Sequence, residues 1–179
     1  MLKNLFRSRS AERPGLALYA QAVEQARRPG FYTDLGVSDE IDARFELYTL
    51  HVLLLILRLR DEPGAGAERG AEAGQDLFDV YVSALDNALR ELGVHDVTIG
   101  KKMRKLGEAL YGRMTAYEAP IREGDVASLA TGLARNVYES DEPGRGGDLA
   151  AYALEARALL ESQSIETVLS QARWPEVAR

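Results

Sequence analysis

The sequence predicts an all-α fold, a single compact domain of six to seven helices around a central apolar helix at about 39–60. Apolar residues recur every three or four positions over nearly the whole chain, which is the period of a helix packed on one side. The run from Val52 to Leu57 is apolar on every side, so other helices must surround it. No segment shows a convincing strand alternation, and 179 residues are enough to bury one core.

The first half of the chain predicts three helices. "GLALYAQAVEQARRPG" has helical periodicity and stops at the Pro-Gly pair 29–30, and "FYTDLGV" is a short connector. Ser38 or Asp39 can cap the central helix. The Gly/Ala/Glu-rich stretch 61–74 indicates a flexible loop, and 75–92 is an amphipathic helix with Gly93 at its end. Asp86 and Arg90 lie one turn apart on its polar side.

The second half predicts a helix from Asp96 or Thr98 to about Tyr117, followed by a helix that Asp125 caps. A second loop covers 140–147, and two further helices end before Pro175. We therefore expect a basic N-terminal tail at 1–14, a helical domain at 15–173 and a C-terminal tail at 174–179. The N-terminal tail lacks the apolar segment of a secretory signal, although a short targeting or membrane-touching role stays open.

The composition excludes several kinds of site. The chain has no cysteine, so disulfides and Cys-ligated zinc are excluded, and its glycines form no nucleotide-binding fingerprint. We expect no cofactor, metal or catalytic set. His51 lies within the most apolar stretch, which favours a core histidine bonded to a buried carbonyl or carboxylate over a catalytic or ligand role. His95 lies in the turn "GVHDV", and we interpret it as a surface histidine rather than a catalytic base.

A basic cluster opens the helix "KKMRKLGEALYGR" (101–113), although the chain carries 22 Lys+Arg against 28 Asp+Glu and a net charge of -6. A solvated polar face explains part of it, since Glu108 neutralises neighbours one turn away. However, like charges one turn apart repel, and cations are unfavourable at the start of a helix. Gly107 and Gly112 also weaken this helix unless another element or a partner approaches closely. A partner-facing role and a structural polar face both remain open.

Two long stretches resemble the ubiquinol–cytochrome c chaperone family. They are "LYAQAVEQARRPGFYTDLGVSDEIDARFELYTLHVLLLILRL" and "LFDVYVSALDNALRELGVHDVTIGKKMRKLGEALYGRMTAYE", within about 18–138. The resemblance implies an all-helical, non-enzymatic assembly factor for the ubiquinol–cytochrome c reductase (bc1) complex. It would bind cytochrome b or another bc1 subunit, and its mitochondrial relatives also work with the ribosome and a small partner protein. The chain begins almost directly at the domain, so we expect a bacterial protein of the cytoplasm, with possible peripheral contact with the inner membrane and no DNA partner.

Within this resemblance, the basic cluster becomes a candidate surface for the client or partner, because charges around an apolar groove steer association. The candidate partner-binding residues are Lys101, Lys102, Lys105, Arg113 and Tyr117.

Three other functions are weighed against the chaperone. The main alternative is a helical bundle that binds an apolar small ligand such as a lipid or quinone. An enzyme using carboxylates alone is disfavoured because no nucleophile–base set appears. Nucleic-acid binding is disfavoured by the net acidity.

Overall fold

The structure is a computed structural model that describes residues 14–91 and 96–177. Within these two stretches there are eight α-helices and two short 3-10 helices, and no strand. The α-helices are α1 (Pro14–Ala26), α2 (Pro29–Thr33), α3 (Ile41–Arg60), α4 (Ala67–Glu91), α5 (Asp96–Glu123), α6 (Val126–Val137), α7 (Gly147–Glu161) and α8 (Ile165–Gln171). The 3-10 helices are η1 (Gly64–Gly66) and η2 (Pro143–Gly146). The predicted all-α fold is confirmed; the short α2 occupies the expected connector.

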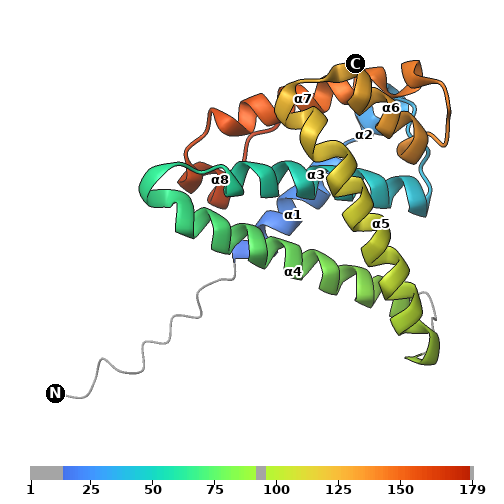
Figure 1. The fold of residues 1–179 in the computed structure, drawn as a ribbon, viewed down its shortest axis with the longest axis horizontal. Helices are drawn as coiled ribbons and strands as arrows, with labels where there is room; N and C mark the ends of the chain where they lie inside the picture. The colour runs from blue at the N-terminus through green and yellow to red at the C-terminus, as the bar shows by residue number, and fades with distance from the viewer. Residues whose placement is uncertain (1–13, 92–95, 178–179) are drawn as a thin grey trace.

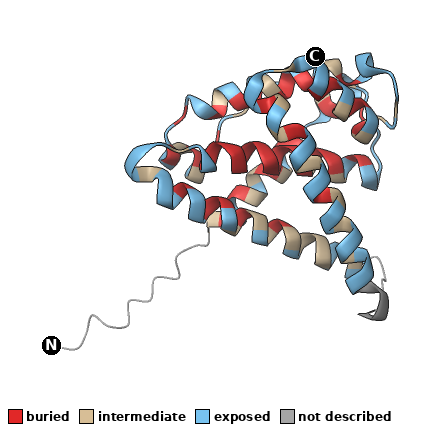
Figure 2. Ribbon diagram, in the orientation of Figure 1, coloured by how far each residue is buried: buried red, intermediate tan, exposed pale blue. Residues whose placement is uncertain are grey.

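Helix α3 is the centre of the molecule, as predicted. Every residue from Thr49 to Leu59 is buried. This stretch has no exposed side because α1, α4, α5, α6 and α7 all contact α3. Figure 1 shows α3 running through the middle of the ribbon, and Figure 2 shows that it carries the longest buried segment.

The predicted helix caps had mixed outcomes. Asp125 caps α6, because its Oδ1 accepts a hydrogen bond from the backbone N–H of Ser128 at 3.0 Å. The prediction that Ser38 or Asp39 caps α3 is wrong, because the helix begins later and its N-cap, Glu40, makes no side-chain cap bond. The Asp39 carboxylate instead accepts a hydrogen bond from Arg44 Nε at 2.8 Å.

The predicted flexible loop at 61–74 is wrong beyond its first residues, because α4 already begins at Ala67. Gly70 explains the difference. A Cβ built there would overlap the carbonyl oxygen of Leu59, so the glycine allows α4 to lie directly against α3. The glycines that suggest a loop in the sequence therefore permit a close contact between two helices. Further along α4, the Asp86–Arg90 pair predicted on its polar side is present, with Nε and Oδ2 2.7 Å apart.

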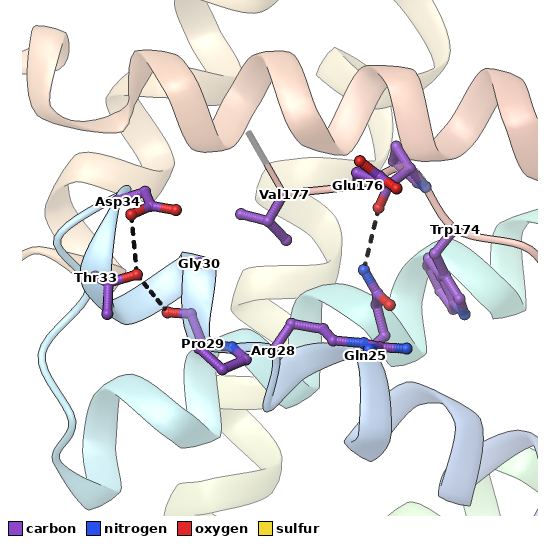
Figure 3. A pocket seen from close by; sticks show the side chains of 10 residues that line it. Gln25, Arg28, Pro29, Gly30, Thr33, Asp34, Trp174, Glu176 and Val177 are labelled. Carbon is purple, nitrogen blue, oxygen red and sulfur yellow. Dashed lines mark hydrogen bonds between the residues drawn. The ribbon is translucent and has the colours of Figure 1, made fainter. Parts of the chain in front are cut away.

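The C-terminal residues 174–177 pack on the body rather than forming the predicted tail. Pro175 is buried, and its carbonyl accepts a hydrogen bond from Gln25 Nε2 at 3.3 Å. Figure 3 shows this segment facing α1 and α2 across a cavity of about 920 Å³. Arg28, Asp34 and Glu176 are among the residues that line it. Of the predicted N-terminal tail at 1–14, residue 14 is the first of α1. Residues 1–13, Gly93, His95 and residues 178–179 lie outside the described residues.

Helices α4 and α5 converge at one end of the molecule, away from the middle of α3 (Figure 1). The apolar side chains in the second half of α4, such as Val82 and Leu85, are only half-buried. Exposure also increases along α5 from the buried Ile121 back toward Gly100, as Figure 2 shows. The fold therefore holds the basic cluster at a thinly covered end of the molecule.

Candidate partner-binding surface

The basic cluster lies on the exposed side of α5. Lys101, Lys102, Arg104 and Lys105 are all exposed, and none of them forms an ion pair with a carboxylate of the described residues. Glu108 is exposed on the same helix without pairing with Arg104 or Lys105. Four cations therefore face solvent in a chain whose net charge is -6, which suits the approach of an acidic partner.

Arg113 has a different position from the lysines, because it connects α5 to α3. Its Nε and Nη2 donate to Glu46 Oε1 at 2.7 and 2.6 Å, and its guanidinium lies 6.0 Å from the centre of the Phe45 ring. The Arg113 side chain is 26% exposed, whereas Glu46 is almost fully buried. Arg113 is therefore mainly an anchor that positions α5, with only its edge at the surface.

Glu46 is the most buried carboxylate in this region. Burial raises its pKa, and the hydrogen bond and positive charge of Arg113 act in the opposite direction. Its second oxygen, Oε2, has no hydrogen-bond partner among the described residues. Loss of Arg113 would leave this carboxylate buried with no compensating charge.

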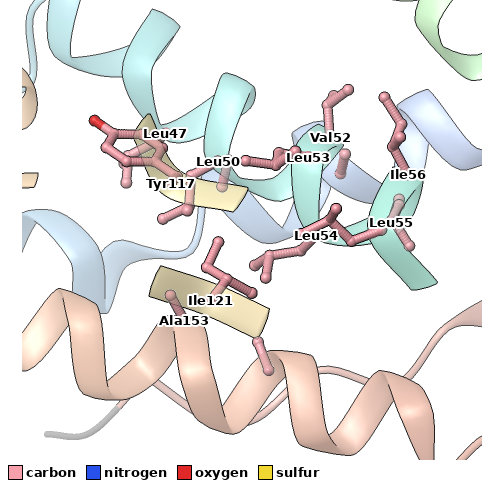
Figure 4. Packing of buried hydrophobic residues seen from close by; sticks show 14 of the residues in the cluster. Leu47, Leu50, Val52, Leu53, Leu54, Leu55, Ile56, Tyr117, Ile121 and Ala153 are labelled. Carbon is pink, nitrogen blue, oxygen red and sulfur yellow. The ribbon is translucent and has the colours of Figure 1, made fainter. Parts of the chain in front are cut away.

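Tyr117 lies in the core of the protein and not on the candidate surface. Its side chain is 1% exposed, and its hydroxyl accepts a hydrogen bond from Asn136 Nδ2 at 2.8 Å. It shares the inner side of α5 with Leu110 and Ile121, which lie seven and four positions away. Figure 4 shows the Tyr117 ring within the packed cluster beside the leucines of α3.

Tyr111 is an exposed residue that the sequence interpretation missed. Its side chain is 74% exposed, more than any other large apolar side chain of the described residues. A signal was present in the sequence, because a tyrosine six positions before Tyr117 must point to a different side of the same helix. Gly107 and Gly112 lie on exposed sides too, and no atom outside the helix backbone lies within 4 Å of a Cβ built at either. The described chain therefore offers neither glycine a close neighbour.

His51 is a core residue, as expected. Its Nδ1 lies 2.7 Å from the carbonyl oxygen of Leu47, and its Nε2 lies 2.9 Å from the Tyr152 hydroxyl. Since the carbonyl can only accept, Nδ1 carries the proton and Nε2 accepts from Tyr152. Burial lowers the pKa of His51 to about 4, so the ring is neutral at pH 7. Both ring nitrogens are used in structural contacts.

The described residues contain no group of three or more side chains that could hold a metal ion. Nor is any helix in the described stretches long and apolar enough to cross a membrane.

Comparison with known proteins agrees with this architecture. The family model described as "Ubiquinol-cytochrome C chaperone" matches residues 33–174, which is most of the chain. The chain belongs to the ubiquinol–cytochrome c chaperone family. The matched stretch covers α3 to α8 and therefore includes the whole candidate surface on α5.

Two relatives support the family assignment. The crystal structure of the Cbp3 homolog from Brucella abortus has a TM-score of 0.82 and 31% identity, and the match covers 99% of this chain and 98% of that one. The ubiquinol-cytochrome-c reductase complex assembly factor 1 of Xenopus laevis is 23% identical over 156 residues, which are 86% of this chain and 76% of the relative. The family is one of assembly chaperones for the bc1 complex.

Proposed function

We propose that this protein is a non-enzymatic chaperone that binds cytochrome b, or another bc1 subunit, while the complex is assembled. The observation that carries the proposal is the membership in the chaperone family over residues 33–174, combined with the exposed cations at the start of α5. The ionisable groups inside the fold are engaged in structural contacts, as His51 and Glu46 illustrate. The part of the surface with unpaired charge is therefore suited to holding another molecule rather than to chemistry.

In this proposal Lys101, Lys102 and Lys105 guide an acidic region of the client toward the thinly covered end formed by α4 and α5. Charges at the rim of an interface mainly accelerate association. Arg113 maintains the position of α5 through Glu46 and offers its exposed edge to the client. We place the protein in the cytoplasm at the surface of the inner membrane, where its client is inserted.

The test is charge reversal at the cluster. The triple variant Lys101→Glu, Lys102→Glu and Lys105→Glu should keep the fold, with a change in Tm below about 2 °C, because all three side chains are exposed. The level of bc1 complex in a strain carrying only this variant should fall several-fold. Cytochrome b haem spectra and bc1 activity measure the outcome.

A control of equal charge reverses three exposed arginines elsewhere on the surface, Arg69, Arg135 and Arg173. Arg69 pairs with Glu166 at 3.4 Å, but both side chains are exposed, so loss of this pair should cost little stability. This control changes the net charge by the same amount and should leave bc1 levels unchanged. Normal bc1 levels in the lysine variant would contradict a role of the cluster, and normal levels in a strain lacking the protein would contradict the function itself.

A further inference from the structure

A cavity opens on the surface between the first half of α1 and the middle of α4. Its volume is about 300 Å³, and four residues with apolar side-chain surface help to line it: Leu16, Tyr19, Val80 and Ala84. Leu16 is 59% exposed, whereas the other three are half-buried. We call this cavity with its lining residues the α1–α4 groove.

The groove lies next to the point where α1 and α4 touch. The backbone N–H of Gly15 donates to Asp76 Oδ2 at 2.9 Å, and a Cβ built at Gly15 would overlap the backbone carbonyl of Asp76. Figure 1 shows α1 leaving this contact toward α3, while α4 runs on toward the start of α5. The two helices therefore diverge, and Leu16 and Val80 line the space that opens between them.

The apolar surface of each wall repeats with the period of a helix. On α1, Ala20 and Val23 lie four and seven positions after Leu16, so they continue its side of the helix. On α4, Ala84 lies one turn after Val80. Such a strip suits an elongated partner, because an amphipathic helix docks its apolar side into a groove through side chains at i, i+3, i+4 and i+7.

Acidic side chains form one edge of the groove. Asp79 is exposed and lines the cavity, and Glu72 lies seven positions earlier, on the same side of α4. Neither carboxylate pairs with a cation of the described residues, and Asp79 accepts a hydrogen bond from the Gln75 amide at 2.8 Å. Asp86 continues the row, but it is paired with Arg90. The edge therefore keeps two unpaired negative charges, which favour a basic partner.

We propose that the α1–α4 groove binds an amphipathic α-helix of a partner protein. Apolar side chains of that helix pack on Leu16 and Val80, and its lysine or arginine side chains lie against Glu72 and Asp79. The proposal does not depend on the proposed function, because it concerns a different surface from the basic cluster of α5. A basic helix is attracted to the groove and repelled by that cluster, and anionic lipid headgroups are repelled by the groove.

The experiment titrates the full-length protein with labelled model peptides and follows fluorescence anisotropy. The first peptide has about 18 residues, with leucine at helical spacing and lysine elsewhere. The second has glutamate in place of lysine, and the third has serine in place of leucine. The wild-type protein should bind the leucine–lysine peptide with a micromolar Kd and the other two at least about tenfold more weakly. Equal binding of the serine–lysine peptide would show attraction by charge alone and overturn the groove.

Leu16→Ser tests the apolar wall without changing the charge. Val126→Ser is the matched control, because Val126 is another exposed apolar side chain, 47% exposed, and lies on α6. Both variants should keep the Tm within about 2 °C. Leu16→Ser should weaken binding of the leucine–lysine peptide by about five- to tenfold, whereas Val126→Ser should stay within about twofold of the wild type. Equal effects of the two variants would contradict the proposal.

The acidic edge is tested by the double variant Glu72→Lys and Asp79→Lys. It should weaken binding of the leucine–lysine peptide by about tenfold and strengthen binding of the leucine–glutamate peptide. The control is Glu123→Lys with Glu155→Lys, two exposed carboxylates of α5 and α7 that form no ion pair within the described residues. This control changes the net charge equally and should leave both affinities within about threefold. A peptide preference that the first pair leaves unchanged would mean that these carboxylates do not contact the partner.

Two other occupants are distinguished with the same variants. A peptide with the sequence of residues 1–13 carries four basic residues, Lys3, Arg7, Arg9 and Arg13. If it binds more tightly than the model peptide and Leu16→Ser abolishes its binding, the groove takes this segment of the chain and the partner helix is wrong. If the protein binds vesicles containing anionic phospholipid and Leu16→Ser abolishes that binding, the groove contacts lipid and the proposal fails.

Discussion

Glycines within the helical segments of the body and of α5 can have very different surroundings. At Gly70 and Gly146 an added Cβ would overlap a backbone carbonyl, of Leu59 and Ala130 respectively. At Gly107 and Gly112 of α5 an added Cβ would meet nothing. In the body, glycine allows two segments of the same chain to touch. On α5 the described chain supplies no such close neighbour for Gly107 or Gly112.

Charged side chains show the same difference. At the end of α3, Arg58 Nε donates to the carbonyl oxygen of Leu160 at 2.9 Å, and Arg157 Nη2 lies 2.6 Å from Asp61 Oδ2. The lysines of α5 make no such contacts with described residues. The body therefore pairs most of its buried charged groups internally, with Glu46 Oε2 and Arg157 Nη1 as exceptions, whereas the lysines near the start of α5 have no such partners among the described residues.

The largest expected effect is a loss of stability in acid, and it originates at the buried His51. In the unfolded chain His51 binds a proton below pH 6.5, whereas in the native state its pKa is about 4. The unfolded state thus binds more protons between these values, and the free energy of unfolding should fall as pH decreases through that window. His51 contributes a loss of about 3 kcal/mol. Urea unfolding at several pH values measures it.

The His51→Gln variant is the control for this effect, because it cannot titrate in that range. Its free energy of unfolding should depend less steeply on pH between 6.5 and 4. Glu46 contributes with the opposite sign, since burial raises its pKa and its native state binds the extra proton. Equal pH slopes for the variant and the wild type would show that His51 is not shielded from solvent.

The next largest effect is expected at Gly146, where η2 lies against α6. Gly146→Ala should lower the free energy of unfolding by about 2–3 kcal/mol, because the new methyl group displaces the backbone of Ala130. Thermal and urea unfolding measure the change. A loss below about 0.5 kcal/mol would mean that the backbone of Ala130 can shift at little cost. Gly146 would then not differ in effect from the glycines of α5.

The third largest effect is expected at the Arg113–Glu46 pair, which joins α5 to α3. Arg113→Leu should cost about 2 kcal/mol, because Glu46 would remain as a buried unpaired charge; the partial exposure of Arg113 keeps the loss below that of a fully buried pair. Adding Glu46→Gln should recover part of the stability, since no charge then remains buried. A double variant no more stable than Arg113→Leu would indicate that Arg113 acts through packing on Phe45 instead.

The smallest effect is expected on the outer side of α5. Gly112→Ala should raise the free energy of unfolding by about 0.5–1 kcal/mol, because alanine favours the helix and meets no neighbour. Circular dichroism during urea unfolding checks the value. A destabilising result would reveal a close contact at this position and contradict the difference between the two sets of glycines.

Much of the architecture could be predicted from local patterns, but the errors share a cause. Helix α3 was identified because a segment apolar on all sides must be enclosed. The glycines of 67–74 favour a loop in the sequence, whereas Gly70 serves a helix contact with α3 that only the packing reveals. Trp174 likewise belongs to the tail that the sequence predicts, although the centre of its ring lies 5.2 Å from that of His51 in the folded chain.

The sequence by itself determined the helical class, the enclosed position of α3 and the presence of clustered cations in an acidic chain. Only the tertiary structure decided that Tyr117 lies inside and Tyr111 outside, that Arg113 is bonded to Glu46, and that Gly107 has no neighbour in the described chain. The physical reason is that helical periodicity states which side chains share a side of the helix. Whether that side meets the chain's own core or is left for another molecule depends on contacts between segments far apart in the sequence.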